Sequence, residues 1–306
     1  MMNAADRRPV ADILGIAVDA IDMNRAIAHI ADLLEASLAG RRKGYICVAG
    51  VHGVMEAQRD ARLREIYSGS AMTIPDGMPL VWVGRLQGHT AMRRVTGPDL
   101  MAEVFARKEL AGATHFLYGG QEGVADELRD KLLQRFPSAK IVGTFTPPFR
   151  DLTELEEEQV AARIGALKPD IVWVGISTPR QEQFMARYLH RFDTTLMFGV
   201  GAAFDYHTGR IRDCAGWIKR AGLQWLHRLL QDPRRLWRRY LRNNPAFLWL
   251  VALQLLGRKR SAPSFATGGA PSVSPDSRNV CGQGYAGGEG GVKTATRSAA
   301  GLATES

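Results

Sequence analysis

Asp76 is the residue whose type and position best suit acid–base chemistry. It directly follows the β-rich run 72–75 and precedes Gly77, a residue that permits a tight turn. A carboxylate at the end of a strand can serve as the general base for a hydroxyl nucleophile if burial or neighbouring charges tune its pKa. The same residues also fit an Asp-Gly turn in which the aspartate caps the next helix. By themselves they leave both interpretations open.

Arg94 and Gly97 belong to a second candidate, the segment 93–100, which reads Arg-Arg-Val-Thr-Gly-Pro-Asp-Leu. Arginine side chains and helix N-termini both bind phosphates or acidic sugar groups well. Pro98 is a residue type found in the first turn of a helix. An ordinary threonine or glycine cap explains the same residues without any ligand.

Gln181 lies in a third candidate, the segment 177–182, which reads Ser-Thr-Pro-Arg-Gln-Glu and follows another β-rich run. Its hydroxyls, amide and helix start would form a polar pocket, although a capping box explains much of the pattern. The glycine-rich segment 199–205 has a superficial likeness to a dinucleotide fingerprint. It lies late in the chain and lacks a following long helix and strand, so it is weak evidence for a nicotinamide-dependent dehydrogenase.

Basic and aromatic residues are concentrated in the segment 210–260. Its formal charge is +11, against +9 for the whole chain, so the basicity describes one surface rather than the protein at large. A solvated charged face, a surface for anionic lipid and a surface for the nucleic-acid backbone all fit this composition. The interleaved aromatic residues are Trp217, Trp225, Trp237, Tyr240, Phe247 and Trp249.

No motif predicts a metal site, and we expect no cofactor. The seven histidines form no HxH or HExxH pattern. The three cysteines, Cys47, Cys214 and Cys281, lie far apart, and we expect reduced thiols. The apolar stretch 13–21 is interrupted by Asp19 and lacks the flanking features of a signal peptide, so a cytoplasmic location is expected.

Short β-rich runs alternate with helical stretches between residues 10 and 209, which predicts an α/β fold with a Rossmann-like, mostly parallel sheet and flanking helices. Ligands of such sheets bind outside the carboxyl ends of the strands, where the Asp76 turn and the segment 177–182 lie. The strands are expected at 45–51, 72–75, 114–118, 140–144, 170–176 and 195–200, and helices at 54–66, 98–110, 124–136, 155–167 and 179–192.

Three parts of the chain are expected: an α/β catalytic domain (1–209), a basic helical appendage (210–260) and a disordered low-complexity tail (261–306). The appendage should form helices at 217–230, 233–242 and 245–256, separated by Pro233 and Pro245. Its longest apolar run, 246–256, is too short to cross a bilayer, which needs about 20 residues, but suits the interface.

Taken together, these segments resemble the WecG/TagA/CpsF family of glycosyltransferases from about residue 10 to residue 257. Eight segments occur in the family's order and at plausible spacing, which makes the resemblance specific although each is weak alone. They are Asp76-Gly77, the segment 94–100, Phe-Leu-Tyr-Gly-Gly at 116–120, Gly143-Thr144 with Pro-Pro-Phe at 147–149, Pro-Arg-Gln-Glu at 179–182, the segment 199–205, Gly-Leu-Gln-Trp-Leu at 222–226 with Arg-Leu-Leu at 228–230, and the segment 233–241.

The resemblance implies an inverting, metal-independent transferase that moves a hexose-type sugar from a UDP-sugar to a polyprenyl-diphosphate-linked saccharide. Such enzymes act at the cytoplasmic face of the membrane in exopolysaccharide or other cell-surface polymer synthesis. The partners expected are therefore the UDP-sugar, the lipid-linked acceptor and an anionic membrane surface, with a homo-oligomer as one option and no nucleic acid. The alternative is a non-catalytic module that binds a nucleotide-sugar or an anionic polymer.

The resemblance also assigns roles to residues. Asp76 corresponds to the proposed catalytic base, and Arg94, Gly97 and Gln181 to the donor site. Arginines of the appendage would approach the site and stabilise the leaving diphosphate, because a guanidinium holds two phosphate oxygens at once. The candidates are Arg212, Arg228, Arg234, Arg235, Arg238 and Arg239.

Three departures from the family pattern bear on this assignment, and one of them is Arg212-Asp213-Cys214 where Arg-Ala-Pro is usual. Val48-Ala49-Gly50 stands where many relatives carry Thr-x-Asn, which leaves the donor sugar open, especially an N-acetylhexosamine. Gln224 replaces the glutamate of the Gly-Leu-Glu-Trp motif and removes a negative partner from an arginine-rich patch.

Overall fold

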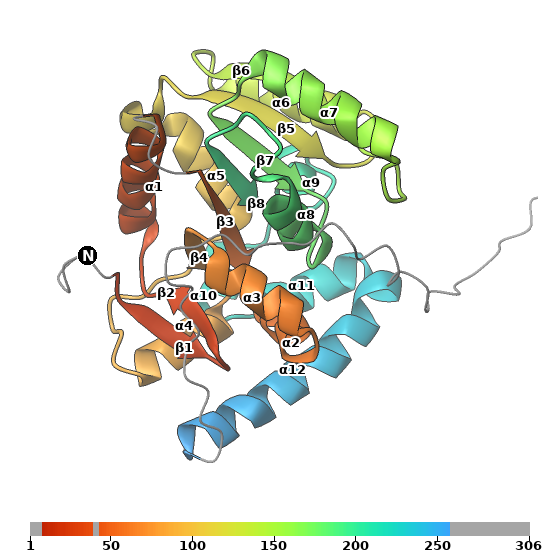
Figure 1. Ribbon diagram of the computed structural model, residues 1–306. Coiled ribbons are helices and arrows are strands. Elements are labelled where there is room, and N and C mark those ends of the chain that lie inside the picture. The colour runs from red at the N-terminus through yellow and green to blue at the C-terminus, as the bar shows by residue number, and fades with distance from the viewer. Residues whose placement is uncertain (1–7, 39–42, 258–306) are drawn as a thin grey trace, which may run out of the picture. The chain divides into compact units, whose positions relative to one another are not determined.

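Six parallel strands form the central sheet of the computed structural model, which describes residues 8–38 and 43–257 (Figure 1). The strand order is β4-β3-β8-β7-β5-β6, and every neighbouring pair is parallel. All six strands expected from the sequence are confirmed to within two residues at each end. They are β3 (Gly44–Ala49), β4 (Met72–Pro75), β5 (Thr114–Gly119), β6 (Lys140–Phe145), β7 (Ile171–Gly175) and β8 (Leu196–Gly199).

Helices cover both faces of the sheet because successive side chains of a strand point to opposite faces. In β5, Phe116 and Tyr118 enter one apolar core and Leu117 the other. One core is completed by α2 (Val51–Arg59), α3 (Ala61–Gly69), α7 (Glu154–Leu167) and α8 (Arg180–Tyr188). The other is completed by α1 (Met23–Leu38), α5 (Gly97–Ala106), α6 (Val124–Arg135) and α9 (Ala203–His207).

The first predicted helix is divided in the structure. The stretch expected as a helix at 54–66 forms α2 and α3, with Asp60 between them. The Asp60 carboxylate accepts hydrogen bonds from the backbone nitrogens of Arg62 and Leu63. This aspartate therefore caps a new helix, and local hydrogen bonding prevails over the continuous apolar pattern.

An antiparallel hairpin precedes the sheet and was not expected from the sequence. It consists of β1 (Val10–Ile13) and β2 (Ile16–Asp19). Asp19, which interrupts the apolar stretch, is buried and accepts a hydrogen bond of 2.7 Å from the backbone nitrogen of Thr73 in β4. Arg8 lies 3.3 Å from the same carboxylate. The hairpin is thus joined to the edge strand that leads to Asp76.

The C-terminal segment contains three helices with boundaries that differ from those expected. The stretch 217–230 is divided into α10 (Gly216–Arg220) and α11 (Gln224–Gln231), because Gly222 adopts a left-handed φ of 73°. The break expected at Pro245 is wrong, since α12 (Pro233–Leu255) runs through it. Pro245 has no backbone N–H, so the carbonyl of Leu241 loses its helical hydrogen bond. Both residues are exposed, so water can donate a hydrogen bond to that carbonyl.

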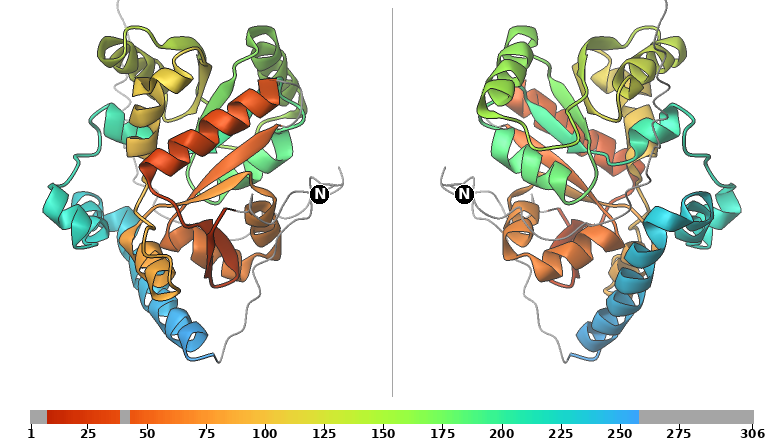
Figure 2. Two further views of the ribbon diagram at one scale, coloured as in Figure 1. Left: turned by 90° about the vertical axis from the view of Figure 1, so that its left-hand side faces the viewer. Right: turned by 90° about the vertical axis from the view of Figure 1, so that its right-hand side faces the viewer.

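Helix α12 packs against α2, and Figure 2 shows α10 and α11 on the outer side of the molecule beside it. Phe247 and Val251 of α12 are buried in the same core as α2. The side chain of Gln254 accepts from the backbone nitrogen of Leu14 (3.1 Å) and donates to the carbonyl of Asp12 (2.9 Å). The far end of α12 is therefore held by the hairpin.

All described residues belong to one compact unit. The boundary expected at residue 210 stays a prediction, and the expected tail, 261–306, lies outside the described residues. Cys47 and Cys214 are free thiols, whereas Cys281 lies outside the described ranges. None of the helices within 8–38 and 43–257 is long and apolar enough to cross a membrane.

Candidate active site

Asp76 stands at the carboxyl end of β4, where the chain turns into α4 (Met78–Leu86). Its backbone nitrogen donates a hydrogen bond of 2.8 Å to the carbonyl of Ala49, at the end of β3. Gly77, with φ of 127°, makes the turn and occupies the cap position of α4, and no side chain caps this helix. The carboxylate of Asp76 is therefore not used as a helix cap.

The environment of Asp76 suits a general base. Burial raises the pKa of Asp76 from 3.8 to about 6, while the guanidinium groups of Arg94 and Arg228 oppose the rise and Asp99 adds to it. A carboxylate with a pKa near 6 is ionised at pH 7 and yet binds a proton more readily than an ordinary aspartate. The chain thus brings Asp76 and two of the candidate arginines into one electrostatic group.

Arg94 lies between α4 and α5, and its side chain is 13% exposed. Its Nη1 donates a hydrogen bond to the Oε1 of Gln224 in α11, and its Nη2 lies 4.0 Å from Asp99. Thr96 caps α5 by accepting from the backbone nitrogen of Asp99. The segment therefore contains the ordinary cap that its sequence allows, and also an arginine turned toward the appendage.

Gly97 begins α5 at a point where no larger residue fits. A Cβ at this position would lie 2.7 Å from the carbonyl oxygen of Val200 and 3.3 Å from its Cα. The first turn of α5 and the glycine-rich loop after β8 are therefore in direct backbone contact. This close approach explains why a glycine precedes Pro98 here.

Gln181 is 1% exposed, and both ends of its amide are bonded within the protein. Its Oε1 accepts a hydrogen bond of 2.9 Å from the backbone nitrogen of Gly201, and its Nε2 donates to Thr178 (3.3 Å) and Glu182 (3.0 Å). Burial raises the pKa of Glu182. Gln181 therefore ties the loop after β7 to the loop after β8.

Arg228 is the appendage arginine most closely associated with Asp76. Its guanidinium lies 5.7 Å from the ring centroid of Tyr206 in α9, a cation–π arrangement. The Nε2 of Gln224 donates to the Tyr206 hydroxyl at 3.3 Å. Burial raises the pKa of Tyr206 to about 12, and the nearby charge of Asp76 adds to this rise. Tyr206 and Gln224 thus link the appendage to the strand ends.

The other appendage arginines are distributed differently. Arg239 is partly buried, and its charge contributes to lowering the pKa of His52 in α2. Arg235 pairs with Asp232 at 2.6 Å, and Arg238 lies over the ring of Trp237. The exposed members of the set are Arg212, Arg234, Arg235 and Arg238.

No sequence motif indicated Tyr206, His52 or Asn243 as residues of the site. Tyr206 directly follows the glycine-rich segment 199–205, which was the one signal available for it. His52 and Asn243 come from α2 and α12, and no motif joins these distant positions. Among the described residues, no group of three or more His, Cys, Asp or Glu side chains is arranged to hold a metal ion.

Comparison with known proteins agrees with the resemblance seen in the sequence. The family model described as "Glycosyl transferase WecG/TagA/CpsF family" matches residues 11–261. A protein of Bacillus spizizenii is 30% identical over 209 residues, which cover 68% of this chain and 79% of the relative. A Bacillus subtilis protein is 28% identical over 220 residues, covering 72% and 84%.

A more distant relative from Staphylococcus aureus is 24% identical over 241 residues, which cover 79% of this chain and 91% of that protein. All three relatives are named N-acetylglucosaminyldiphosphoundecaprenol N-acetyl-beta-D-mannosaminyltransferase. The similarity thus extends through both the sheet and the C-terminal helices.

The raised pKa of Asp76 predicts a pH-dependent gain of stability in Asp76→Asn. Because the folded state holds this proton more tightly than the unfolded state, the group stabilises the fold at low pH. That contribution is lost as the pH rises through about 6. The neutral amide of the variant avoids this loss, so its free energy of unfolding should exceed that of the wild type by roughly 1 to 3 kcal/mol at pH 8.

Urea unfolding at pH 4 and pH 8 measures this difference, with the exposed Asp32→Asn as the control. The advantage of Asp76→Asn should shrink toward pH 4. An advantage of equal size at both pH values would show that the buried charge is not its cause.

Proposed function

The chain belongs to the WecG/TagA/CpsF family of glycosyltransferases, and from this premise we propose the reaction that it catalyses. It transfers a hexose-type sugar from a UDP-sugar to a polyprenyl-diphosphate-linked saccharide, with inversion and without a metal ion. The product enters exopolysaccharide or another cell-surface polymer. The observation that carries the proposal is a carboxylate of raised pKa, close to two arginines, at the carboxyl edge of a parallel sheet.

Asp76 acts as the general base in this proposal. It accepts the proton of an acceptor hydroxyl as that oxygen attacks the anomeric carbon of the donor sugar. The bond between this carbon and the diphosphate oxygen breaks, and UDP leaves with the electron pair. A single in-line displacement of this kind inverts the anomeric configuration. With a pKa of about 6, Asp76 is ready to accept the proton at pH 7.

Arg94 and Arg228 stabilise the charge that develops on the leaving diphosphate. Both lower the pKa of Asp76, which supports their closeness to the reacting atoms. Gln224 accepts a hydrogen bond from Arg94 without neutralising it, so the positive charge stays available to the substrate. Positive groups held in place before the reaction are an effective way to stabilise such charge.

Gly97 and Gln181 shape the donor-sugar side of the site. The contact between Gly97 and Val200 and the hydrogen bond from Gly201 to Gln181 both order the loop after β8. Gly50, at the end of β3, leaves room beside Asp76, since a Cβ there would approach the Asp76 carbonyl oxygen to 3.0 Å. The relatives' names mention an N-acetyl-beta-D-mannosaminyl group, whereas residues 48–50 here read Val-Ala-Gly, so the donor hexose is left open.

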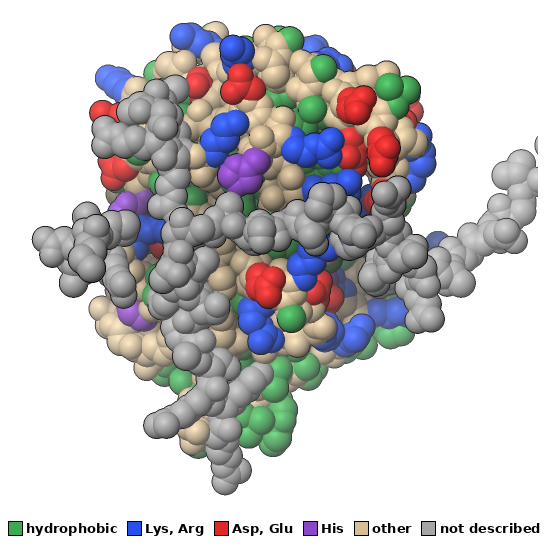
Figure 3. Space-filling model, viewed as in Figure 1, with side chains coloured by type: hydrophobic (Ala, Val, Ile, Leu, Met, Phe, Trp, Pro, Cys, Tyr) green, Lys and Arg blue, Asp and Glu red, His purple; other side chains and the backbone are tan. Residues whose placement is uncertain are grey.

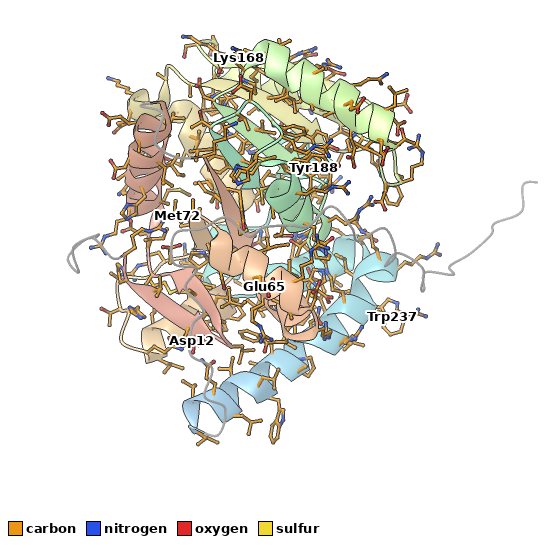
Figure 4. The ribbon with its side chains drawn as sticks, in the orientation of Figure 1. Asp12, Glu65, Met72, Lys168, Tyr188 and Trp237 are labelled. Carbon is orange, nitrogen blue, oxygen red and sulfur yellow. The ribbon has the colours of Figure 1, made fainter. Side chains whose placement is uncertain are left out.

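The acceptor and membrane surface are proposed from the appendage and the relatives. The relatives' names specify a diphosphoundecaprenol acceptor, a lipid that is held in a membrane. Figure 3 shows hydrophobic side chains along the lower edge of the molecule, where α12 runs, and Figure 4 shows Trp237 pointing outward. Tryptophans and arginines together suit the interface of an anionic membrane. This would place the enzyme peripherally on the cytoplasmic face.

Asp76→Asn should abolish most transfer while the protein stays folded. Loss of a general base typically costs about 10² to 10⁴ in rate, measured as UDP release from the donor and a lipid-linked acceptor. In the wild type, kcat/KM should fall as the pH drops below about 6, because Asp76 becomes protonated. Full activity of Asp76→Asn would refute the assignment of the base.

Arg228→Ala should lower kcat about 10²- to 10³-fold, because it removes one preorganised positive group from the leaving diphosphate. The matched control is Arg220→Ala, which removes an exposed arginine of α10. Steady-state kinetics separate the two variants. Equal activities of Arg228→Ala and Arg220→Ala would contradict the role of Arg228.

Replacing Trp217, Trp237 and Trp249 by serine should weaken binding to phosphatidylglycerol vesicles, by about tenfold for each side chain that enters the interface. These tryptophans are 62%, 45% and 66% exposed, so their replacement should leave the core intact. Co-sedimentation measures binding, and Phe149→Ser, at a residue 97% exposed after β6, is the control. Undiminished binding of the triple variant would exclude this surface.

A further inference from the structure

We propose that Asn243 is a positioning residue that acts through His52 to fix the loop after β7, and so sets the sugar-binding side of the donor site. The inference rests on the proposed function, because it assigns the interface between α12 and α2 a role in donor binding by a UDP-sugar-dependent transferase. It is carried by hydrogen bonds from the appendage to α2 and from the loop after β7 to the sheet edge, and by the packing of Thr178 against α2 between them.

The series begins at Asn243, which is buried on the face of α12 that packs against α2 and is 3% exposed. Its Oδ1 accepts a hydrogen bond of 2.9 Å from the Nη2 of Arg59, and its Nδ2 lies 3.0 Å from the Nδ1 of His52. Because an arginine can only donate, Arg59 determines which end of the amide is the oxygen. The amide nitrogen therefore faces His52 and donates to it.

His52 receives this hydrogen bond as a neutral imidazole. Burial, together with the charge of Arg239, lowers the pKa of His52 to about 4, against opposing effects of Glu56 and Thr178. Since Nδ1 accepts from Asn243, the single ring proton lies on Nε2. The backbone of Thr178 acts on the same ring by raising its pKa, and a Cβ on the neighbouring Gly53 would lie 3.5 Å from the Cγ2 of Thr178. His52 thus accepts a hydrogen bond from the appendage and lies beside the loop after β7.

This loop transmits the constraint to the sheet edge. The hydroxyl of Thr178 donates to Glu182 (2.9 Å) and accepts from the Nε2 of Gln181 (3.3 Å), whose Oε1 accepts from the backbone of Gly201 (2.9 Å). Ser177 has a φ of 73°, which is unfavourable for a residue with a side chain, so the surrounding contacts must hold the loop. The series ends in the loop that contacts the first turn of α5.

Polar contacts are needed here because apolar packing does not determine register. Phe247 and Val251 bury apolar surface against α2, and such contacts have little directionality. A buried amide, in contrast, is stable only where its partners lie, so Asn243 selects one position of α12 along α2. That position also keeps Arg239 beside His52.

The test is Asn243→Asp, which keeps the shape and still accepts from Arg59 but cannot donate to His52. The carboxylate and the unprotonated Nδ1 then face each other as two acceptors, so the ring must move its proton to Nδ1, turn, or bind a second proton, and its interaction with Thr178 changes. Calorimetric titration of the full chain gives dissociation constants for UDP and for the UDP-sugar that most raises the thermal midpoint of the wild type. The constant for the UDP-sugar should rise about three- to tenfold, and that for UDP less than about twofold.

Asn244→Asp is the matched control, because it introduces the same charge one position along α12. It should leave both dissociation constants unchanged. A second pair of variants keeps the test decisive if Asn243→Asp does not fold. His52→Gln retains an amide that can donate to Thr178 and should bind the UDP-sugar better than His52→Leu, which retains no polar group.

The outcomes separate the two proposals. If the wild type binds neither UDP nor any UDP-sugar, the proposed function fails and this inference fails with it. If the wild type binds both ligands and Asn243→Asp weakens them equally, the amide has a general structural role and the inference alone is overturned. Equal binding by His52→Gln and His52→Leu would overturn it in the same way.

Discussion

Parallel pairing of β3 with both β4 and β8 is the constraint on which the site depends. The register sets Ala49 beside Pro75 and Cys47 beside Gly199, so the three strands end at one edge of the sheet. The chain leaves β3 toward β4, whereas the later strands lie on the other side of β3. Such a reversal of direction opens space between the connecting loops. The backbone there carries Asp76, and the loop after β8 contacts α5.

The second determinant is the way in which the C-terminal helices close onto this edge. Helix α12 is fixed at its apolar face by Phe247 and Val251 and at its end by Gln254, which bonds to the hairpin. Helix α11 is fixed by the hydrogen bond between Gln224 and Arg94. The appendage thus supplies Arg228, whose positive charge limits the rise in the pKa of Asp76 that burial causes. Charge and apolar packing act together in one segment.

Sequence patterns predicted the six strands well because a buried parallel strand leaves a short, continuous apolar run. They did worse where local hydrogen bonding or solvent access competes with periodicity. Asp60 divides an apolar stretch by capping α3, and Pro245 is accommodated in α12 because it faces water. The hairpin was missed because Asp19 breaks its apolar pattern, and only the fold shows that this carboxylate bonds to Thr73 of β4.

Local patterns and ordered motifs were enough to predict the α/β class, the family, and Asp76 and Arg94 as candidates. The fold was needed to show which of the six appendage arginines acts on the charge of Asp76, since that depends on how α11 packs beside Tyr206. It also revealed the contact between Asn243 and His52, residues 191 positions apart. Hydrogen bonds between distant residues leave no periodicity in a single chain, and so no sequence pattern could have indicated this one.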